Sequence, residues 1–538
     1  MSKKRNRMQI QHKDIPPSQN ESAAVWNHPW RRLPHPFRLA FLSACLIGAV
    51  THIYVFTNLL LNHDSVWRIY YDNDVLSSGR WSLEFFSNFS TYFQLPVVIA
   101  LISILMLALT AGITVVFLDI SHKLSIILTA AFIVTFPSVA CIFSYMYTAD
   151  AYFIALFLNA AAAYLAKRYR FGWIPAVLLC ATACGIYQAF ICYAIGLFLL
   201  DCIFNLLSKK PIPQIIRDGI RYIGISIGSL VLYYVVLKLI LLITGTTLVS
   251  YQGLDSMSLK NIGKFILEVP PAYHNFLQFF LHCSFFEKFY QVIQNLLLVL
   301  SAFPLLYLII SSKIYRELSR ILLLILTIAL IPLALNFITV LSIGAWVHAL
   351  MIYAFLLLYV FIIKLFENAA AQLKANGQNG QALFVCHAVL AFILIWNNFC
   401  ISNVAYLRLQ VNYEASFALA NRIVARVEVL DGYSPDLPVA VVGNASTKLF
   451  GNKVSQFSKF NSLTGTTDSL LYSPETSVRT RNFIQTYIGF NMPRPNGEQI
   501  AMLKNSGVIE DMPSYPSEGS VLIYNDVIVI KLSDGEVR

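Results

Sequence analysis

Apolar runs of about 20 residues recur along most of this chain, and they constrain its fold more than any other feature. A helix of roughly 20 residues crosses the hydrocarbon core of a bilayer. The composition agrees, because 57% of the residues are hydrophobic, 12% are charged, and the mean hydropathy is +0.63. The runs lack the alternation that marks an outer-membrane β-barrel. The sequence therefore predicts an α-helical polytopic membrane protein.

Short basic segments separate the apolar runs, and all of them fall on one side of the predicted membrane. Basic loops face the cytoplasm, so the pattern predicts about eleven transmembrane helices with the N-terminus inside and the C-terminus outside. The net charge of +11 is concentrated in the N-terminal tail and these loops, and it does not indicate nucleic-acid binding. Three domains are predicted: a basic cytoplasmic tail (1–36), a transmembrane domain (37–403) and a soluble extracytoplasmic domain (404–538).

The last segment of the chain has the pattern of a small α+β domain. Its predicted strands are short runs of apolar and β-branched residues, and the last two are joined by Asn525-Asp526 in the manner of a hairpin. The predicted strands are Leu437–Val442, Val521–Tyr524 and Val527–Ile530, and the predicted helices are Arg481–Ile488 and Glu498–Asn505.

A polar stretch from Asn62 to Trp81 directly follows the first apolar run and concentrates acidic, basic and aromatic residues. Asp64, Arg68 and Asp72 are spaced i, i+4, i+8, so they share one face of a helix. One interpretation is a solvated helix whose charges pair with one another. The other is a site that acts on a substrate at the lipid boundary. Four more residues of interest follow within about two turns of helix: Asp74, Gly79, Arg80 and Trp81.

Other polar residues lie at the predicted outer turns. Asp150 follows the third span, where it either caps the fourth span or contacts a substrate. Tyr187 and Gln188 lie at an outer break between the fifth and sixth spans, and His348 lies at a later outer turn, where an interfacial histidine is the alternative. The residues from Ser82 to Phe93 are predicted to form an aromatic interfacial helix, and those from Gly245 to about Tyr290 a long outer loop.

Several kinds of site are missing from the sequence. There is no glycine-rich loop that would cradle a phosphate, no His/Cys cluster with the spacing of metal ligands and no nucleotide-binding domain. The sequence therefore predicts neither a metal nor a cofactor, and it shows no recognisable site for ATP or a nucleotide-sugar.

The order of these motifs resembles that of the GtrII family of bacterial glucosyltransferases. The shared features are an acidic residue after the first span, an Arg four residues later, a Gly-Arg pair, and a Tyr-Gln pair at an outer break. A C-terminal YPSEGSV segment and the hairpin after it also resemble the family's tail. One departure is His63-Asp64, where an Asp-Asp pair is expected. The matching residues are Asp64, Arg68, Gly79, Arg80, Tyr187 and Gln188.

The resemblance implies a polytopic transferase of the GT-C type in the bacterial inner membrane, with its C-terminal domain in the periplasm. The implied donor is a sugar, most often glucose, carried on undecaprenyl phosphate. The implied acceptor is a periplasmic glycan such as lipid-linked O-antigen. The product is a side-branch sugar that modifies lipopolysaccharide and changes the serotype.

This chemistry assigns roles to the polar residues. Transfer with inversion needs one carboxylate to take the proton of the acceptor hydroxyl and a cation to stabilise the departing phosphate. Asp64 is the candidate base, with Asp72 and Asp74 as alternatives. Arg68 and Arg80 are candidates for the donor phosphate, since guanidinium binds phosphate oxygens in a bidentate manner. The candidate substrate-binding residues are Asp150, Tyr187, Gln188 and His348.

Two other functions fit a chain with many spans and no nucleotide site. One is a transporter or flippase of lipid-linked sugars, and the other is an O-antigen polymerase. Transporters place their polar residues near the bilayer midplane, whereas the polar residues of this chain cluster at a predicted membrane surface. The sequence therefore favours the transferase.

Overall fold

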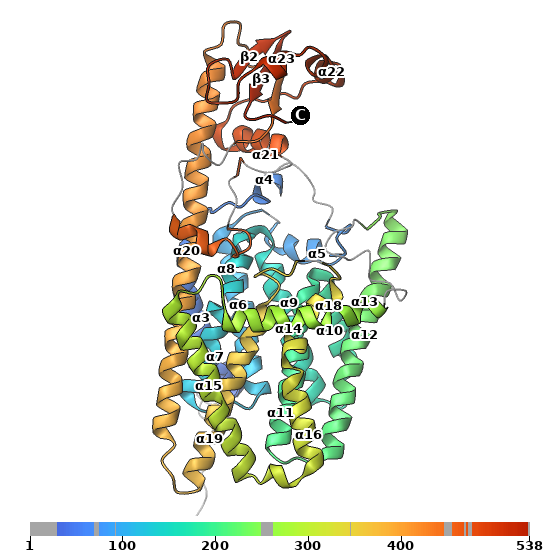
Figure 1. Cartoon of the computed structure of the whole chain (residues 1–538). Helices are drawn as coiled ribbons and strands as arrows, with labels where there is room; N and C mark the ends of the chain where they lie inside the picture. The colour runs from blue at the N-terminus through green and yellow to red at the C-terminus, as the bar shows by residue number, and fades with distance from the viewer. Residues whose placement is uncertain are drawn as a thin grey trace, which may run out of the picture.

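A bundle of long helices carries a small sheet-containing region at one end (Figure 1). The structure is a computed structural model that describes residues 29–68, 75–91, 93–248, 262–344, 346–445, 455–466, 470–471 and 476–535. We call the end of the bundle beside the sheet the upper end, as it is oriented in Figure 1, and the opposite end the lower end.

Ten helices in the described part of the chain are long and apolar enough to cross a membrane, which confirms the predicted polytopic α-helical fold. The eleventh predicted crossing corresponds to α10 (Trp173–Ile186), whose 14 residues extend only about 21 Å at 1.5 Å per residue. The ten are α3 (His35–Thr57), α6 (Pro96–Phe117), α7 with α8 (Lys123–Thr135 and Pro137–Ser144), α9 (Met146–Arg168), η2 with α11 (Gln188–Phe190 and Ile191–Leu207), α12 (Ile212–Thr244), α15 (Lys288–Ser311), α16 with α17 (Leu318–Ala329 and Ile331–Leu335), η6 with α19 (Tyr353–Phe355 and Leu356–Ala375) and α20 (Gln381–Glu428).

Short helices fill several connections between these spans. α5 (Leu83–Ser87) and η1 (Asn88–Ser90) occupy the predicted interfacial helix. α13 (Ile262–Leu267) and α14 (Val269–Leu281) lie where the sequence predicts a loop, and α14 runs across the bundle in Figure 1. Two prolines occupy the first turn of α14, where a helix tolerates a missing N–H. The remaining short helices of this part are α2 (Pro29–Arg32), α4 (Ser65–Arg68), η5 (Ile314–Arg316) and α18 (Phe337–Leu341).

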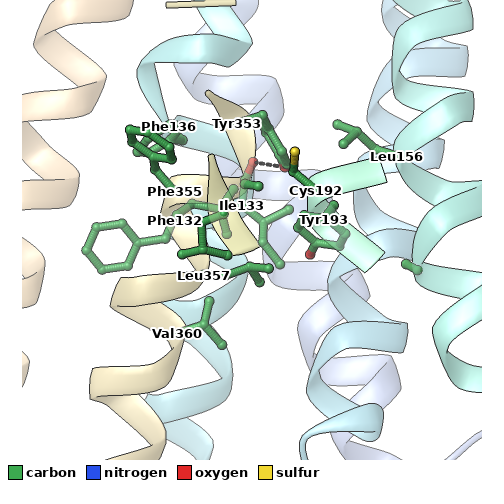
Figure 2. Packing of buried hydrophobic residues seen from close by; sticks show 14 of the residues in the cluster. Phe132, Ile133, Phe136, Leu156, Cys192, Tyr193, Tyr353, Phe355, Leu357 and Val360 are labelled. Atoms are coloured by element: carbon green, nitrogen blue, oxygen red, sulfur yellow. Dashed lines mark hydrogen bonds between the residues drawn. The ribbon is translucent and has the colours of Figure 1, made fainter. Parts of the chain in front are cut away.

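Side chains in the core of the bundle form hydrogen bonds with backbone carbonyls where a proline interrupts a span. Pro137 has no N–H to offer the carbonyl of Ile133, four residues earlier. The Tyr353 hydroxyl donates to that carbonyl instead, over 2.8 Å (Figure 2). The next carbonyl, that of Val134, accepts from His52 Nε2 over 2.8 Å. Side chains from other helices thus replace the lost helical hydrogen bonds, as a nonpolar surrounding requires.

The outside of the bundle keeps large apolar side chains exposed, as a lipid-facing surface does. Leu242, Val299 and Phe392, on three different helices, are 80%, 65% and 62% exposed. Such a surface would be unfavourable in water, so it supports burial in a bilayer.

The C-terminal sheet region is joined to the bundle by α20, which continues without interruption through the predicted boundary at residue 404. Its 48 residues extend about 72 Å, from the lower end to the sheet (Figure 1). β1 (Val439–Val442) pairs parallel to β3 (Val527–Lys531), which pairs antiparallel to β2 (Val521–Tyr524). Asn525 and Asp526 both have positive φ, which confirms the predicted hairpin. The helices here are η8 (Ser455–Phe460), α21 (Thr476–Phe483), η9 (Ile484–Ile488), α22 (Gly497–Asn505) and α23 (Val508–Asp511).

Candidate functional site

The structure describes most of the candidate residues, and they come from segments far apart in the sequence. Asp72 and Asp74 lie outside the described residues, and for Arg68 the structure describes only its position at the end of α4. Among the described residues, no group of three or more His, Cys, Asp or Glu side chains could hold a metal ion.

Asp64 lies in a turn between α3 and α4, and it faces the C-terminal sheet region. The Asn62 side chain accepts from the backbone N–H groups of Asp64 and Ser65, at 3.1 and 2.9 Å, and so fixes the turn. One oxygen of the Asp64 carboxylate lies 3.5 Å from Arg479 Nη2 and 3.4 Å from His63 Nε2. The Asp64 side chain is 36% exposed, so it is partnered but still accessible.

Arg479 belongs to α21, and no sequence pattern indicates that it would meet Asp64. Arg481, two residues further along the same helix, donates to the carbonyls of Met492 and Val439, over 2.6 and 2.7 Å. Burial lowers the pKa of Arg481 to about 10, so its side chain stays charged at neutral pH. One arginine thus holds the sheet region together, while the other reaches the bundle. The sequence around the two arginines does not show which of them has which role.

The His63 ring connects this turn to the start of α9. It packs edge-on against the Tyr145 ring, with centroids 6.1 Å apart. Tyr145 immediately precedes the first residue of α9, and the Ser144 hydroxyl beside it contacts the carbonyl of Thr464. The junction of α8 and α9 therefore lies between the bundle and the C-terminal region.

Arg80 rests on an aromatic platform. Its guanidinium carbon lies 4.8 Å from the centre of the Tyr187 ring, and its Nη1 lies 3.4 Å from the Tyr152 hydroxyl. The Tyr152 and Tyr187 rings stack on each other with centroids 4.9 Å apart. A guanidinium held over an aromatic ring keeps its charge and much of its hydrogen-bonding edge.

The turn that carries Arg80 is tied to the break between α10 and α11. The carbonyl of Gly79 accepts from the Tyr233 hydroxyl at 2.9 Å and from Gln188 Nε2 at 3.4 Å. Gln188 Nε2 also donates to the Tyr233 hydroxyl at 2.8 Å. The backbone N–H of Ser82 donates to the carbonyl of Gly185. Two motifs about a hundred residues apart therefore form one unit, in which Gln188 and Tyr233 position the Gly79-Arg80 pair.

We expect Gly79→Ala to destabilise the protein by about 1–3 kcal/mol. Gly79 has φ +74°, and an added Cβ would lie 2.8 Å from the Tyr233 hydroxyl and 3.2 Å from Gln188 Nε2. The measurement is the thermal unfolding midpoint in detergent. Gly497→Ala is the control, because that glycine has open space around it. Equal midpoints for the two variants would contradict the constraint on this turn.

Asp150 lies within α9 and is fully buried. The helix begins at Met146, so Asp150 does not occupy the N-cap position, and the capping interpretation is wrong. Its Oδ1 accepts from the N–H of Ala151 at 2.8 Å, and the Ser90 hydroxyl lies near the carboxylate, while no hydrogen bond within 3.5 Å reaches Oδ2 from the described residues. A buried carboxylate oxygen without a partner is costly, and such groups often mark sites that receive a polar ligand.

His348 lies in the connection between α18 and η6. It lines a cavity of about 220 Å³ together with Phe279, His282, Trp346 and, from the C-terminal region, Ser462. Burial, with a further contribution from the charge of Arg80, lowers the pKa of His348 to about 4. The imidazole is therefore neutral at pH 7, and the positive charge of Arg80 contributes to its lowered pKa.

The fold defines a multi-pass α-helical membrane protein, in which polar residues from distant segments gather near the upper end. The sequence model of one family, described as glucosyl transferase GtrII, matches residues 53–361, more than half of the chain. The chain therefore belongs to the GtrII glucosyl transferase family. Neither a curated protein nor a solved structure matches it. The matched range includes the candidates from Asp64 to His348, whereas Arg479 lies outside it.

Proposed function

We propose that this chain is an inverting GT-C glycosyltransferase of the bacterial inner membrane, which moves glucose from undecaprenyl phosphate to a periplasmic glycan such as lipid-linked O-antigen. Membership in the GtrII family supports glucosyl transfer. In this proposal residues 1–36 form the cytoplasmic tail, residues 37–403 the transmembrane domain and residues 404–538 the periplasmic domain. The upper end of the bundle then faces the periplasm.

The observation that carries the proposal is the place of Arg80 at the edge of a lipid-facing element. Arg80 lies three residues before Leu83, the first residue of α5, and its carbonyl accepts from the N–H of Leu83. Phe85 and Phe89, on α5 and η1, are 66% and 63% exposed. A cation fixed beside exposed aromatic side chains suits a phosphate whose other substituent is a hydrocarbon chain.

In the reaction, one bond forms as another breaks. The acceptor oxygen bonds to the anomeric carbon of glucose, the bond from that carbon to the phosphate oxygen breaks, and its electrons stay on the phosphate. The proton of the acceptor hydroxyl passes to the base, for which Asp64 is the first candidate and Asp72 and Asp74 the alternatives. Arg80, with Arg68, stabilises the charge on the departing polyprenyl phosphate.

The remaining candidates serve substrate binding in this proposal. The buried carboxylate of Asp150 is suited to accept a hydrogen bond from a sugar hydroxyl or to act as the base instead. His348, neutral at pH 7, lines a cavity that reaches the C-terminal region, and we assign it to binding of the sugar donor. Tyr187 supports Arg80 as a platform, and Gln188 holds the turn that presents it.

The proposal is tested with the purified full chain in liposomes, supplied with undecaprenyl phosphate carrying radiolabelled glucose and with a lipid-linked glycan acceptor. We expect label to join the acceptor, with the anomeric configuration opposite to that of the donor. Label that crosses the membrane without joining the acceptor would indicate a transporter. Acceptor that is extended by whole repeat units would indicate a polymerase.

We expect Arg479→Ala to lower kcat/KM by about tenfold, a loss of roughly 1.4 kcal/mol, because the Asp64 carboxylate loses the cation that orients it. Arg479→Lys keeps the charge and should restore part of the rate. Arg422→Ala, at an exposed position on α20, is the control. If Arg479→Ala lowers the unfolding temperature and leaves the rate per folded molecule unchanged, the Arg479–Asp64 ion pair contributes only to stability.

A further inference from the structure

A second cavity, lined by both charged and apolar residues, lies at the lower end of the bundle, away from the candidate site. It has a volume of about 870 Å³ and opens between α10 and α12. Arg170, Arg217 and Arg221 line it, and Asp218 is the acidic residue among its lining. Arg170 follows the end of α9 and Arg217 lies near the start of α12, which places the cavity at the opposite end of α9 from Tyr145.

Arg221 is held in a fixed position and retains an unused donor. Its Nη2 donates to the carbonyls of Tyr169 and Arg170, at 2.8 and 3.2 Å, and so closes the C-terminal end of α9. Its Nε is shielded from solvent and has no hydrogen-bond partner among the described residues. Asp218 lies 3.8 Å from Arg217 Nε, too far for a strong charge-assisted hydrogen bond.

The rest of the cavity wall is apolar, and the cavity lies next to the lipid-facing surface of the bundle. Trp173 and Val177 on α10 and Ile225 on α12 contribute to the wall. Two glycines of α12 widen it: an added Cβ at Gly224 would meet nothing within 4 Å, and one at Gly228 would meet only Val177. The neighbouring Leu178, Ile223 and Ile227 are 54%, 61% and 57% exposed, as lipid-facing side chains are.

We propose that this cavity binds the phosphate group of an anionic phospholipid from the lower leaflet, with an acyl chain along its apolar wall. Three arginines and one aspartate leave two net positive charges against the lipid phosphate. Basic pockets between transmembrane helices suit such headgroups, and guanidinium binds phosphate oxygens in a bidentate manner. This inference does not depend on the proposed glucosyl transfer.

The test is native mass spectrometry of the purified full chain, titrated with short-chain phosphatidylglycerol or phosphatidylcholine. We expect phosphatidylglycerol to be retained in preference to phosphatidylcholine. In the double variant Arg170→Gln/Arg217→Gln, the affinity for phosphatidylglycerol should fall by about thirtyfold. Each basic residue contributes roughly 1 kcal/mol, and about 1.4 kcal/mol corresponds to a tenfold change in affinity. Both side chains are exposed, so this variant spares the cap made by Arg221. Arg316→Gln, an exposed arginine of the lower end outside the cavity, should bind as the wild type does.

A second variant, Gly228→Leu, fills the apolar wall without removing charge. It should also weaken retention of phosphatidylglycerol. Equal retention of the two lipids by the wild type would overturn the proposal, as would equal loss in the control and the double variant. Displacement of the lipid by the same concentration of inorganic phosphate would show a site for free anions instead.

Discussion

Asp64→Asn should lower the rate of glucosyl transfer by about 10²–10⁴-fold, the usual contribution of a positioned general base. The amide has the shape of the carboxylate, and its oxygen still faces Arg479 and His63. It cannot take the proton of the acceptor hydroxyl, however. The loss is therefore expected in kcat, with little change in the KM of either substrate, because the carboxylate acts on the proton being transferred and not on the sugar as a whole.

The measurement is single-turnover transfer from labelled donor, normalised to folded protein. Glu510→Gln makes the same chemical change at an exposed position on α23 and should leave the rate unchanged. Activity of Asp64→Asn near that of the wild type would remove Asp64 from the role of base. The same assay of Asp72→Asn, Asp74→Asn and Asp150→Asn would then identify the carboxylate that takes the proton.

The membrane-spanning architecture was predictable from sequence because the transfer of a segment into lipid depends mainly on that segment's own residues. The start of α6 at Pro96 and the hairpin at Asn525-Asp526 follow from local rules in the same way. The helix α14 was not predictable. Its 13 residues are too few to span a membrane, and its place across the bundle depends on tertiary contacts.

The candidate site was predictable as residues but not as an arrangement. The Gly79-Arg80 and Tyr187-Gln188 pairs were each visible in sequence, yet their connection runs through Tyr233, whose hydroxyl bonds to the Gly79 carbonyl. Arg479 carries no local signal at all, because what separates it from Arg481 is the face of α21 on which each lies. Contacts between distant segments depend on packing, which periodicity along one segment does not encode.

Arg80→Ala should lower kcat/KM for the lipid-linked donor by about 10²–10³-fold, the usual effect of removing one donor to a developing negative charge. The guanidinium is held by the Tyr187 ring and the Tyr152 hydroxyl, so its positive charge is fixed beside the proposed phosphate site. Charge accumulates on the phosphate as the glycosidic bond breaks, so the loss should be greater for donor use than for acceptor use.

Arg80→Lys keeps the charge but loses the planar fork, and it should fall between the wild type and Arg80→Ala. Lys238→Ala is the matched control, because that exposed cation also lies over a tyrosine ring, that of Tyr234. The assay varies donor and acceptor concentrations separately. A loss in Arg80→Ala that appears only as a higher KM for the acceptor would assign Arg80 to the glycan. In that case the departing phosphate would need a different cation, and Arg68 would be the first to test.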